Sequence, residues 1–138
     1  MAKVFTGTTL IPGDKIEDYL QAMGKYEKEM EPFRKMLEGL NQEFEAYLTE
    51  QFSVRTTARK HSCKIALFID FLCWDTDVKS IDEITKGIAN SHFRKWYMSK
   101  IGDCSENELK SAIKKFFQFL AEKKNIRNEK VLMSFRTR

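Results

Sequence analysis

Hydrophobic residues recur at helical spacing between residues 105 and 124. At about 100° per residue, one broad stripe carries Leu109, Ala112, Ile113, Phe116, Phe117, Phe119 and Leu120. Ser105 precedes the stripe and Glu108 follows three residues later, which is the spacing of a capping box at the start of a helix. The pattern predicts an amphipathic helix with a buried aromatic side and lysines along its flank.

A second helix is predicted from residue 53 to 74, with Ser53 as its N-cap. One narrow stripe carries Val54, Ala58, His61, Ile65, Phe68, Ile69 and Leu72. After Ile65 the apolar positions spread around the helix and include Ala66, Leu67, Phe71 and Trp74. We therefore expect the second half of this helix to be the central rod of a helical bundle, covered from several sides.

The chain before residue 53 has two helical patterns separated by a proline. Asp14 opens the first, which runs to about Met30, and apolar residues continue at helical spacing to about Phe52. Pro32 either begins a second helix or kinks one long helix. The first pattern is amphipathic and acidic. It either packs against the bundle and enlarges the core, or forms a surface for a partner or a second copy.

A further helix is predicted from Asp82 to Gly102, with Gly102 as its C-cap. Its inward residues are expected to be Ile84, Ile88, Phe93, Trp96, Tyr97 and Ile101. The last 13 residues, 126–138, either dock as a short helix or lead into a following domain. Because strand-like alternation and proline are both scarce, these patterns together predict an all-α chain, and 138 residues suffice for one domain with a real core.

The net charge of +4 is unevenly distributed along the chain. Residues 14–50 carry a net charge of −5, and residues 51–138 carry +8. No acidic residue occurs between Gln51 and Ile69, although four cations stand at the start of the predicted helix there. Cations at a helix N-terminus oppose the helix dipole by about 0.3–1 kcal/mol each. A phosphate backbone is the natural compensating partner.

Two patterns are specific enough to compare with a known family. The first is Thr57, His61, Ile65, Ile69 and Phe71-Leu72, and the second is the run Ser111-Ala112-Ile113-Lys114-Lys115-Phe116-Phe117-Gln118-Phe119-Leu120. Together they resemble the core-binding domain of tyrosine recombinases, the phage integrases, although His61 departs from the usual Tyr. The resemblance covers about residues 40–127 and implies an orthogonal, SAM-like four-helix bundle. The expected organisation is then an extended N-terminus (1–13), an acidic helical extension (14–39), the SAM-like domain (40–127) and a tail or linker (128–138).

In that family the second and fourth helices of the domain hold one side of duplex DNA. Carried over residue by residue, the resemblance implies DNA contacts from Arg55, Thr56, Arg59, Lys60, Lys64, Lys110, Ser111, Lys114 and Lys115. The charge pattern points to the same two cationic flanks without the resemblance. The expected function is a DNA-binding module from an integrase or a mobile-element protein.

No catalytic or cofactor chemistry is predicted. The family's catalytic domain would supply an arginine, a lysine, a His-x-x-Arg element and a tyrosine nucleophile, and the sequence up to Arg138 contains no such arrangement. Glycine-rich phosphate loops are absent, and Cys63, Cys73 and Cys104 lack the CxxC spacing of a zinc site. The odd number of cysteines and the absence of a signal peptide favour a reducing cytoplasm.

The alternative is a helical protein–protein interaction or regulatory module that does not bind DNA. SAM-like bundles also serve that role, and a basic half-chain does not by itself require a nucleic acid. No membrane partner is expected, because the longest apolar stretch, from Ile65 to Trp74, is interrupted by Asp70 and is too short to span a bilayer.

Overall fold

The computed structural model describes residues 16–52, 55–102 and 106–134, except for the side chains of Ile16, Tyr19, Phe52, Arg55 and Glu106. The described residues form helices and no strand, which confirms the all-α expectation. The predicted extended segment 1–13 and the predicted caps Ser53 and Ser105 lie outside this part of the chain.

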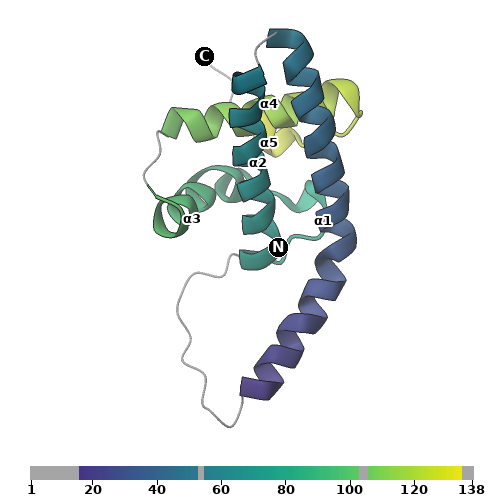
Figure 1. Cartoon of the computed structure of the whole chain (residues 1–138), viewed down its shortest axis with the longest axis vertical. Helices are drawn as coiled ribbons and strands as arrows, with labels where there is room; N and C mark the ends of the chain where they lie inside the picture. Colours follow the sequence, from purple (N-terminus) through teal and green to yellow (C-terminus); the bar gives the residue numbers. More distant parts are fainter. Residues whose placement is uncertain (1–15, 53–54, 103–105, 135–138) are drawn as a thin grey trace.

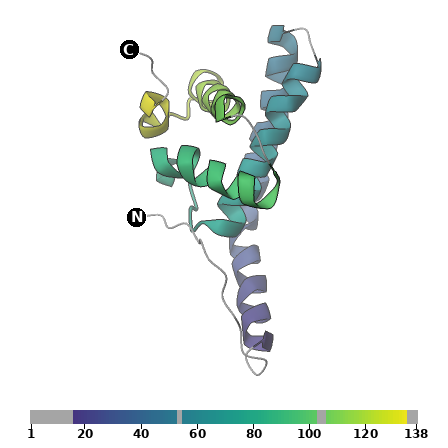
Figure 2. The same cartoon turned by 90° about the vertical axis from the view of Figure 1, so that its left-hand side faces the viewer.

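The helices form two layers. In chain order they are α1 (Ile16–Phe52), α2 (Arg55–Asp75), the 3₁₀ turn η2 (Ile81–Glu83), the π-helical turn η3 (Ile88–His92), α3 (Phe93–Lys100), α4 (Glu106–Lys123) and α5 (Glu129–Ser134). Figure 1 shows α1 and α2 as an antiparallel hairpin, with α4 lying across it. Figure 2 shows α3, α4 and α5 together on one side of the hairpin.

Pro32 lies inside α1, so the sequence's second alternative, one long helix, is the one that forms. A proline within a helix removes one hydrogen bond to the preceding turn and bends the axis. Figure 1 shows the purple first part of α1 inclined to the blue second part. The helix passes residues 39 and 40 without a break, and Leu37 and Leu40 both belong to the common core.

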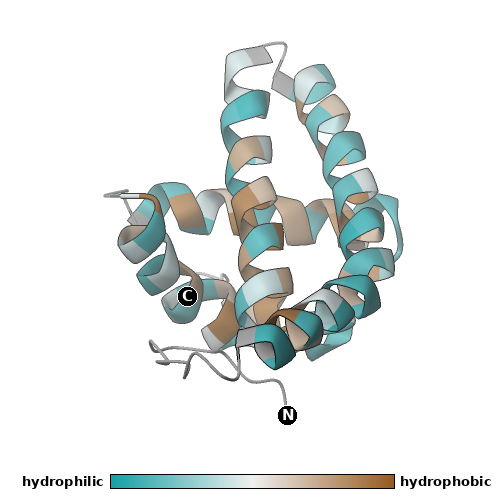
Figure 3. Cartoon of the chain, turned by 60° about the horizontal axis from the view of Figure 1, so that its bottom comes forward, coloured by the Kyte–Doolittle hydropathy of each residue, from teal (hydrophilic) through white to brown (hydrophobic). Residues whose placement is uncertain are grey.

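The core is formed where α2 meets α4 and α3. All seven apolar residues predicted for the stripe of α4 are buried, as the periodicity requires. Phe68 of α2 lies at the centre, with ring centroids 5.0 Å from Phe93 and 6.4 Å from Phe117. Figure 3 shows hydrophobic and hydrophilic residues alternating around the helices, the pattern of amphipathic helices packed in a bundle.

The central-rod prediction for α2 is correct on the sides that meet α1, α3 and α4, but its outer side is open. Trp74 is 55% exposed and Ala66 is also exposed, so the bundle does not bury the side of α2 on which these two apolar residues lie. Trp74 instead contacts Arg34, whose guanidinium carbon lies 5.2 Å from the ring centroid. An indole can remain at a surface when a cation covers one face of the ring.

The first part of α1 packs against the bundle only towards its C-terminal end, where Met30 joins the core and Tyr26 packs against it. Leu20 is 58% exposed and Met23 is 42% exposed, and Met30 is the first buried residue of the described helix. Tyr26 is half-buried, and its hydroxyl donates a hydrogen bond to the carbonyl of Thr76. We call residues 16–31 the arm, because most of this segment projects beyond the two layers (Figures 1 and 2).

The predicted helix from Asp82 to Gly102 begins later than expected. Asp82 belongs to η2, and Ile84 has an extended backbone with φ −71° and ψ 119°. Thr85 Oγ1 then accepts a hydrogen bond from the N–H of Ile88 at 3.2 Å, which is the role of an N-cap. At the other end Gly102 adopts φ 145° and donates to the carbonyl of Tyr97 at 3.1 Å, consistent with its predicted role in ending the helix.

Ile101, predicted to pack inward, is 49% exposed. It follows the last residue of α3 and lies at the C-cap, where the helix no longer holds it against α2 or α4. The inward-facing residues of this region are Ile84, Ile88, Ala89 and Phe93, which are all buried.

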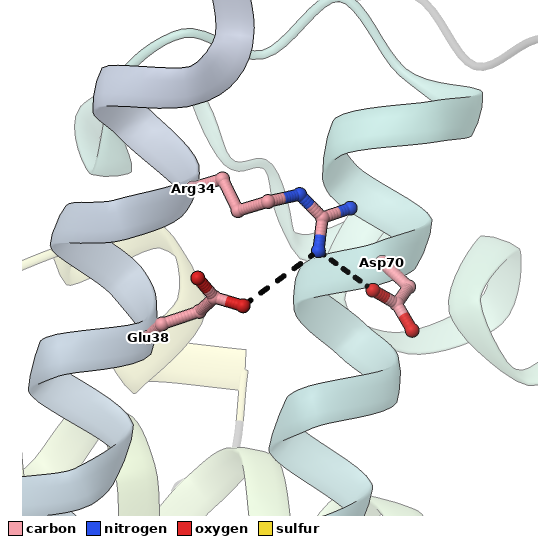
Figure 4. A network of polar contacts seen from close by, with 3 residues as sticks. All are labelled: Arg34, Glu38 and Asp70. Atoms are coloured by element: carbon pink, nitrogen blue, oxygen red, sulfur yellow. Dashed lines mark hydrogen bonds and ion pairs between the residues drawn. The ribbon is translucent and has the colours of Figure 1, made fainter. Parts of the chain in front are cut away.

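One ion pair fastens α1 to the open side of α2 (Figure 4). Arg34 Nη1 donates to Asp70 Oδ1 at 2.9 Å and lies 3.9 Å from Glu38 Oε2. Partial burial acts to lower the pKa of Arg34, but the hydrogen bond to Asp70 and the neighbouring carboxylates outweigh it and raise the pKa above its ordinary value. This cation is therefore used inside the fold and is not offered to a partner.

The tail docks as a short helix, which was one of the two sequence expectations. Val131 is fully buried, Leu132 is half-buried and Met133 is 59% exposed. The buried Asn128 precedes α5 and joins it to η2 through hydrogen bonds to the carbonyls of Ile81 and Ile84.

Candidate nucleic-acid interface

Cations from α2 and α4 meet around His61. This histidine is half-buried at the edge of the core, one turn before the buried Ile65. Lys60 and Lys64 come from its own helix, and Lys115 comes from α4. All three lysines act electrostatically on the imidazole. We call these four residues the His61 cluster.

The pKa of His61 reflects its burial and the positive charges around it. Burial lowers the pKa of its imidazole, and the positive charges of Lys115, Lys64 and Lys60 lower it further. Lys115 is the largest of the three charge effects, although it is 54 positions away in the sequence. The packing of α4 on α2 thus brings one lysine of α4 near two lysines of α2.

The nine residues predicted to contact DNA do not form a single cluster. Thr56 is exposed and lies about 40° around α2 from Lys60, and Ser111 lies about 40° around α4 from Lys115 at 100° per residue. Both therefore border the cluster. The side chain of Arg55 is outside the described residues.

Three of the predicted cations lie on other sides of their helices. Arg59 is exposed and lies about 100° around α2 from Lys60 and about 140° from Lys64. Lys110 and Lys114 are half-buried and lie about 140° and 100° around α4 from Lys115. A ligand seated on the His61 cluster would meet these three side chains only if it also wrapped around the helices.

Acids do not neutralise most of these cations. In the ranges that the structure describes, no ion pair joins Arg59, Lys60, Lys64 or Lys114 to a carboxylate. The acidic α1 instead pairs with cations elsewhere, such as Lys124, whose Nζ lies 2.9 Å from Glu43 Oε1. Among the described residues, Lys60 and Lys64 of the cluster therefore keep their charge available to an anion.

The chemistry available at this surface is electrostatic binding. Lysine ammonium groups contact phosphate oxygens without reading bases, so such contacts position a nucleic acid but do not specify its sequence.

Across the described chain, no group of three or more His, Cys, Asp or Glu side chains could hold a metal ion. Cys63 is exposed on α2 and Cys73 is buried. Among the helices in the described ranges, none is both long enough and apolar enough to cross a membrane.

A second basic surface was missed by the sequence reasoning. Residues 84–102 contain Lys86, Arg94, Lys95 and Lys100 and no acid. The absence of acids over this length is a signal that could have identified the segment. Arg94, Lys95 and Lys100 belong to α3, which also carries the exposed Met98 at 43% and is followed by Ile101 at 49%.

The low pKa of His61 has a consequence for stability. Because the folded-state pKa lies below the unfolded value, the folded protein holds the neutral imidazole more strongly than the unfolded chain does. This contribution is complete above the unfolded pKa of about 6.5 and is lost as the pH falls through the folded value. We expect urea denaturation between pH 7.5 and pH 5 to show a steeper loss of stability in the native protein than in His61→Gln. The two proteins share every other titrating group, so equal slopes would contradict the assignment.

In comparisons with known proteins, no family model, no curated protein and no solved structure matches this chain.

Proposed function

We propose that the chain is a DNA-binding module that holds the phosphate backbone of a duplex with the His61 cluster. The observation that carries the proposal is the convergence of Lys60, Lys64 and Lys115, which belong to two helices and lower the pKa of one imidazole. Like charges brought together repel one another, and an anion that binds between them removes that repulsion. Half-burial of Lys64 and Lys115 limits their hydration and favours a bound phosphate over water.

The proposal includes the finer relationship suggested by the sequence. The chain resembles the core-binding domain of tyrosine recombinases, in which the second and fourth helices face DNA, and the cluster is built from the corresponding α2 and α4. An orthogonal SAM-like bundle would suit the crossing of α4 over the α1–α2 hairpin (Figure 1). In this reading the module has no catalytic activity of its own, acts in an integrase or a mobile-element protein, and resides in the cytoplasm.

The test is the salt dependence of duplex binding. Each neutralised phosphate contributes about −0.9 to the slope of log K against log salt, so three lysines contribute about −2.7. We expect Lys64→Gln and Lys115→Gln each to weaken binding across unrelated sequences and to make the slope about 1 unit less negative. Fluorescence anisotropy with a labelled duplex at about 50 mM and 200 mM salt measures both effects.

Lys35→Gln is the matched control, because it removes the same charge from an exposed lysine of α1 that pairs with Glu31 at 2.9 Å. It should leave the slope near the native value. Equal effects of Lys35→Gln and Lys64→Gln would show that only net charge matters, and no binding of the native protein at low salt would refute the proposal.

Cys63, about 60° around α2 from Lys60, provides a second readout beside the cluster. It is exposed and precedes Lys64, whereas Cys73 is buried and burial raises the pKa of its thiol. In a Cys104→Ser background, duplex DNA should slow the reaction of Cys63 with a maleimide. An unchanged rate at saturating DNA would place the duplex elsewhere on the molecule.

The second candidate function is protein–protein interaction. It is favoured by large exposed apolar side chains outside the cluster, among them Leu20, Met23, Trp74, Met98 and Ile101. These residues lie on the arm, on the neighbouring end of α2 and at α3, away from the lysines of the His61 cluster.

A further inference from the structure

We propose that the arm of one copy docks on α3 of a second copy, so that two chains form a reciprocal dimer. The proposal concerns surfaces other than the His61 cluster and is independent of DNA binding. It begins with the arm, which combines exposed apolar residues with net negative charge.

One face of the arm carries a line of residues at helical spacing. Leu20 and Met23 are followed by Glu27 and Glu31, all within about 80° of one another around the helix. Leu20 is 58% exposed and Met23 is 42% exposed. The arm holds five acids and two lysines among residues 16–31. Gly24 borders this line, and a Cβ at its position would meet nothing within 4 Å, so the surface beside it is open.

The outer face of α3 has the opposite charge. Arg94 and Lys95 come first, and the exposed Met98 and Ile101 follow on the same side of the helix. Neither cation forms an ion pair with an acid among the described residues, and Arg94 Nε is buried without a hydrogen-bond partner there. The face therefore offers positive charge and apolar surface that the rest of the described chain does not use.

The two faces match in register when the helices run antiparallel. Leu20 to Glu27 spans seven residues, and so does Arg94 to Ile101, which is about 10.5 Å at 1.5 Å per residue. In that alignment Leu20 and Met23 meet Ile101 and Met98, while Glu27 meets Arg94 and the neighbouring Lys95, and Glu31 lies about one turn beyond the cations. A parallel alignment would place the apolar pair of the arm against the cations. Charge and apolar pattern thus select one orientation.

A second copy is the occupant that the geometry allows. The arm projects away from the layer that contains α3, so the two faces of one molecule do not meet (Figures 1 and 2). When a two-fold axis relates the copies, the arm of each copy docks on α3 of the other, and the two contacts close a dimer.

Light scattering after size exclusion, from about 10 µM to about 1 mM, tests the proposal. The native protein should shift from monomer to dimer over this range, with greater dissociation at high salt because the contact joins opposite charges. Met98→Glu should raise the dissociation constant at least about tenfold, since it places a carboxylate against Met23 and the acids of the arm. Met133→Glu, on the 59% exposed residue of α5, is the matched control and should leave the dissociation constant unchanged.

A charge exchange identifies the two faces. Glu27→Lys alone and Lys95→Glu alone should each weaken the dimer, and the two substitutions together should restore it. A protein that stays monomeric over the whole range overturns the proposal, and so does a double variant that remains as weak as the single ones. If Lys95→Glu weakens duplex binding without changing the mass, α3 serves DNA and not a second copy. Lys64→Gln should leave the mass unchanged, so this proposal and the DNA proposal can fail separately.

Discussion

Phe68→Ala is expected to destabilise the protein by about 3–5 kcal/mol. The ring is 1% exposed and lies against aromatic side chains from two other helices, Phe93 at 5.0 Å and Phe117 at 6.4 Å between centroids. Truncation removes the transfer free energy of the ring and leaves a cavity between α2, α3 and α4, which cannot all collapse into it at once. Since a typical domain is stable by about 5–15 kcal/mol, this variant retains little stability.

Chemical denaturation monitored by circular dichroism measures the loss, and the melting temperature should fall by roughly 10 °C or more. Phe68→Leu keeps most of the volume and should cost about 1.5 kcal/mol or less. Met133→Ala is the surface control and should change stability by no more than about 0.5 kcal/mol. A loss below about 1 kcal/mol for Phe68→Ala would mean that this ring is not enclosed by three helices.

The helices and their buried faces follow from local periodicity. Phe68 and all seven stripe residues of α4 were predicted inward, and all are buried. The burial of such residues can be predicted from their spacing alone, because an apolar stripe at 100° per residue is buried in the fold regardless of which element packs against it. Pro32 shows the limit of this information, because a proline in the first turn of a helix and a proline that bends a long helix give the same local pattern.

The exposed apolar residues could not be predicted from the same patterns. Leu20 and Ile101 continue helical stripes but lie exposed towards the ends of their helices, and Trp74 lies on the outer side of α2, where Arg34 contacts its ring. Whether an apolar position is covered at the end of a helix depends on the length and crossing of the partner helix. That information comes from long-range packing and is not contained in the spacing.

The candidate site could also be predicted only in part from the sequence. The sequence identified Lys60, Lys64 and Lys115 as cations on two helices, but it could not pair them, because the rotation of α4 against α2 is set by the core. It also grouped Arg59 and Lys114 with them, and those lie about 100° around their helices from the cluster. The number of cations on each helix could be predicted from the sequence, whereas the direction in which each helix presents them depends on how the helices pack.

Asn128→Ala is the second variant with a large expected effect, about 2–4 kcal/mol. The side chain is 4% exposed and uses both of its ends. Its Oδ1 accepts from the N–H of Val131 at 3.1 Å and so caps α5, while its Nδ2 donates to the carbonyls of Ile81 at 2.8 Å and Ile84 at 2.9 Å. Loss of an N-cap costs about 1 kcal/mol. The carbonyl of Ile84 loses its donor, which costs about 1–3 kcal/mol more, whereas the carbonyl of Ile81 still accepts from the N–H of Ile84 at 3.1 Å.

Asn128→Asp separates the two contributions. The carboxylate can still accept from the N–H of Val131, but it has no hydrogen to donate and faces the carbonyl oxygens of Ile81 and Ile84. If the hydrogen bonds from the Asn128 side chain to the carbonyls of Ile81 and Ile84 contribute most of the stability, the Asp variant is at least as unstable as the Ala variant at pH 7. If the cap of α5 contributes most, the stability of the Asp variant is close to that of the native protein. Asn107→Ala in the exposed first turn of α4 is the control and should be near neutral. We expect the first outcome in urea denaturation, because both hydrogen bonds donated by Asn128 are lost and the carboxylate faces two carbonyl oxygens, while only one amide keeps its acceptor.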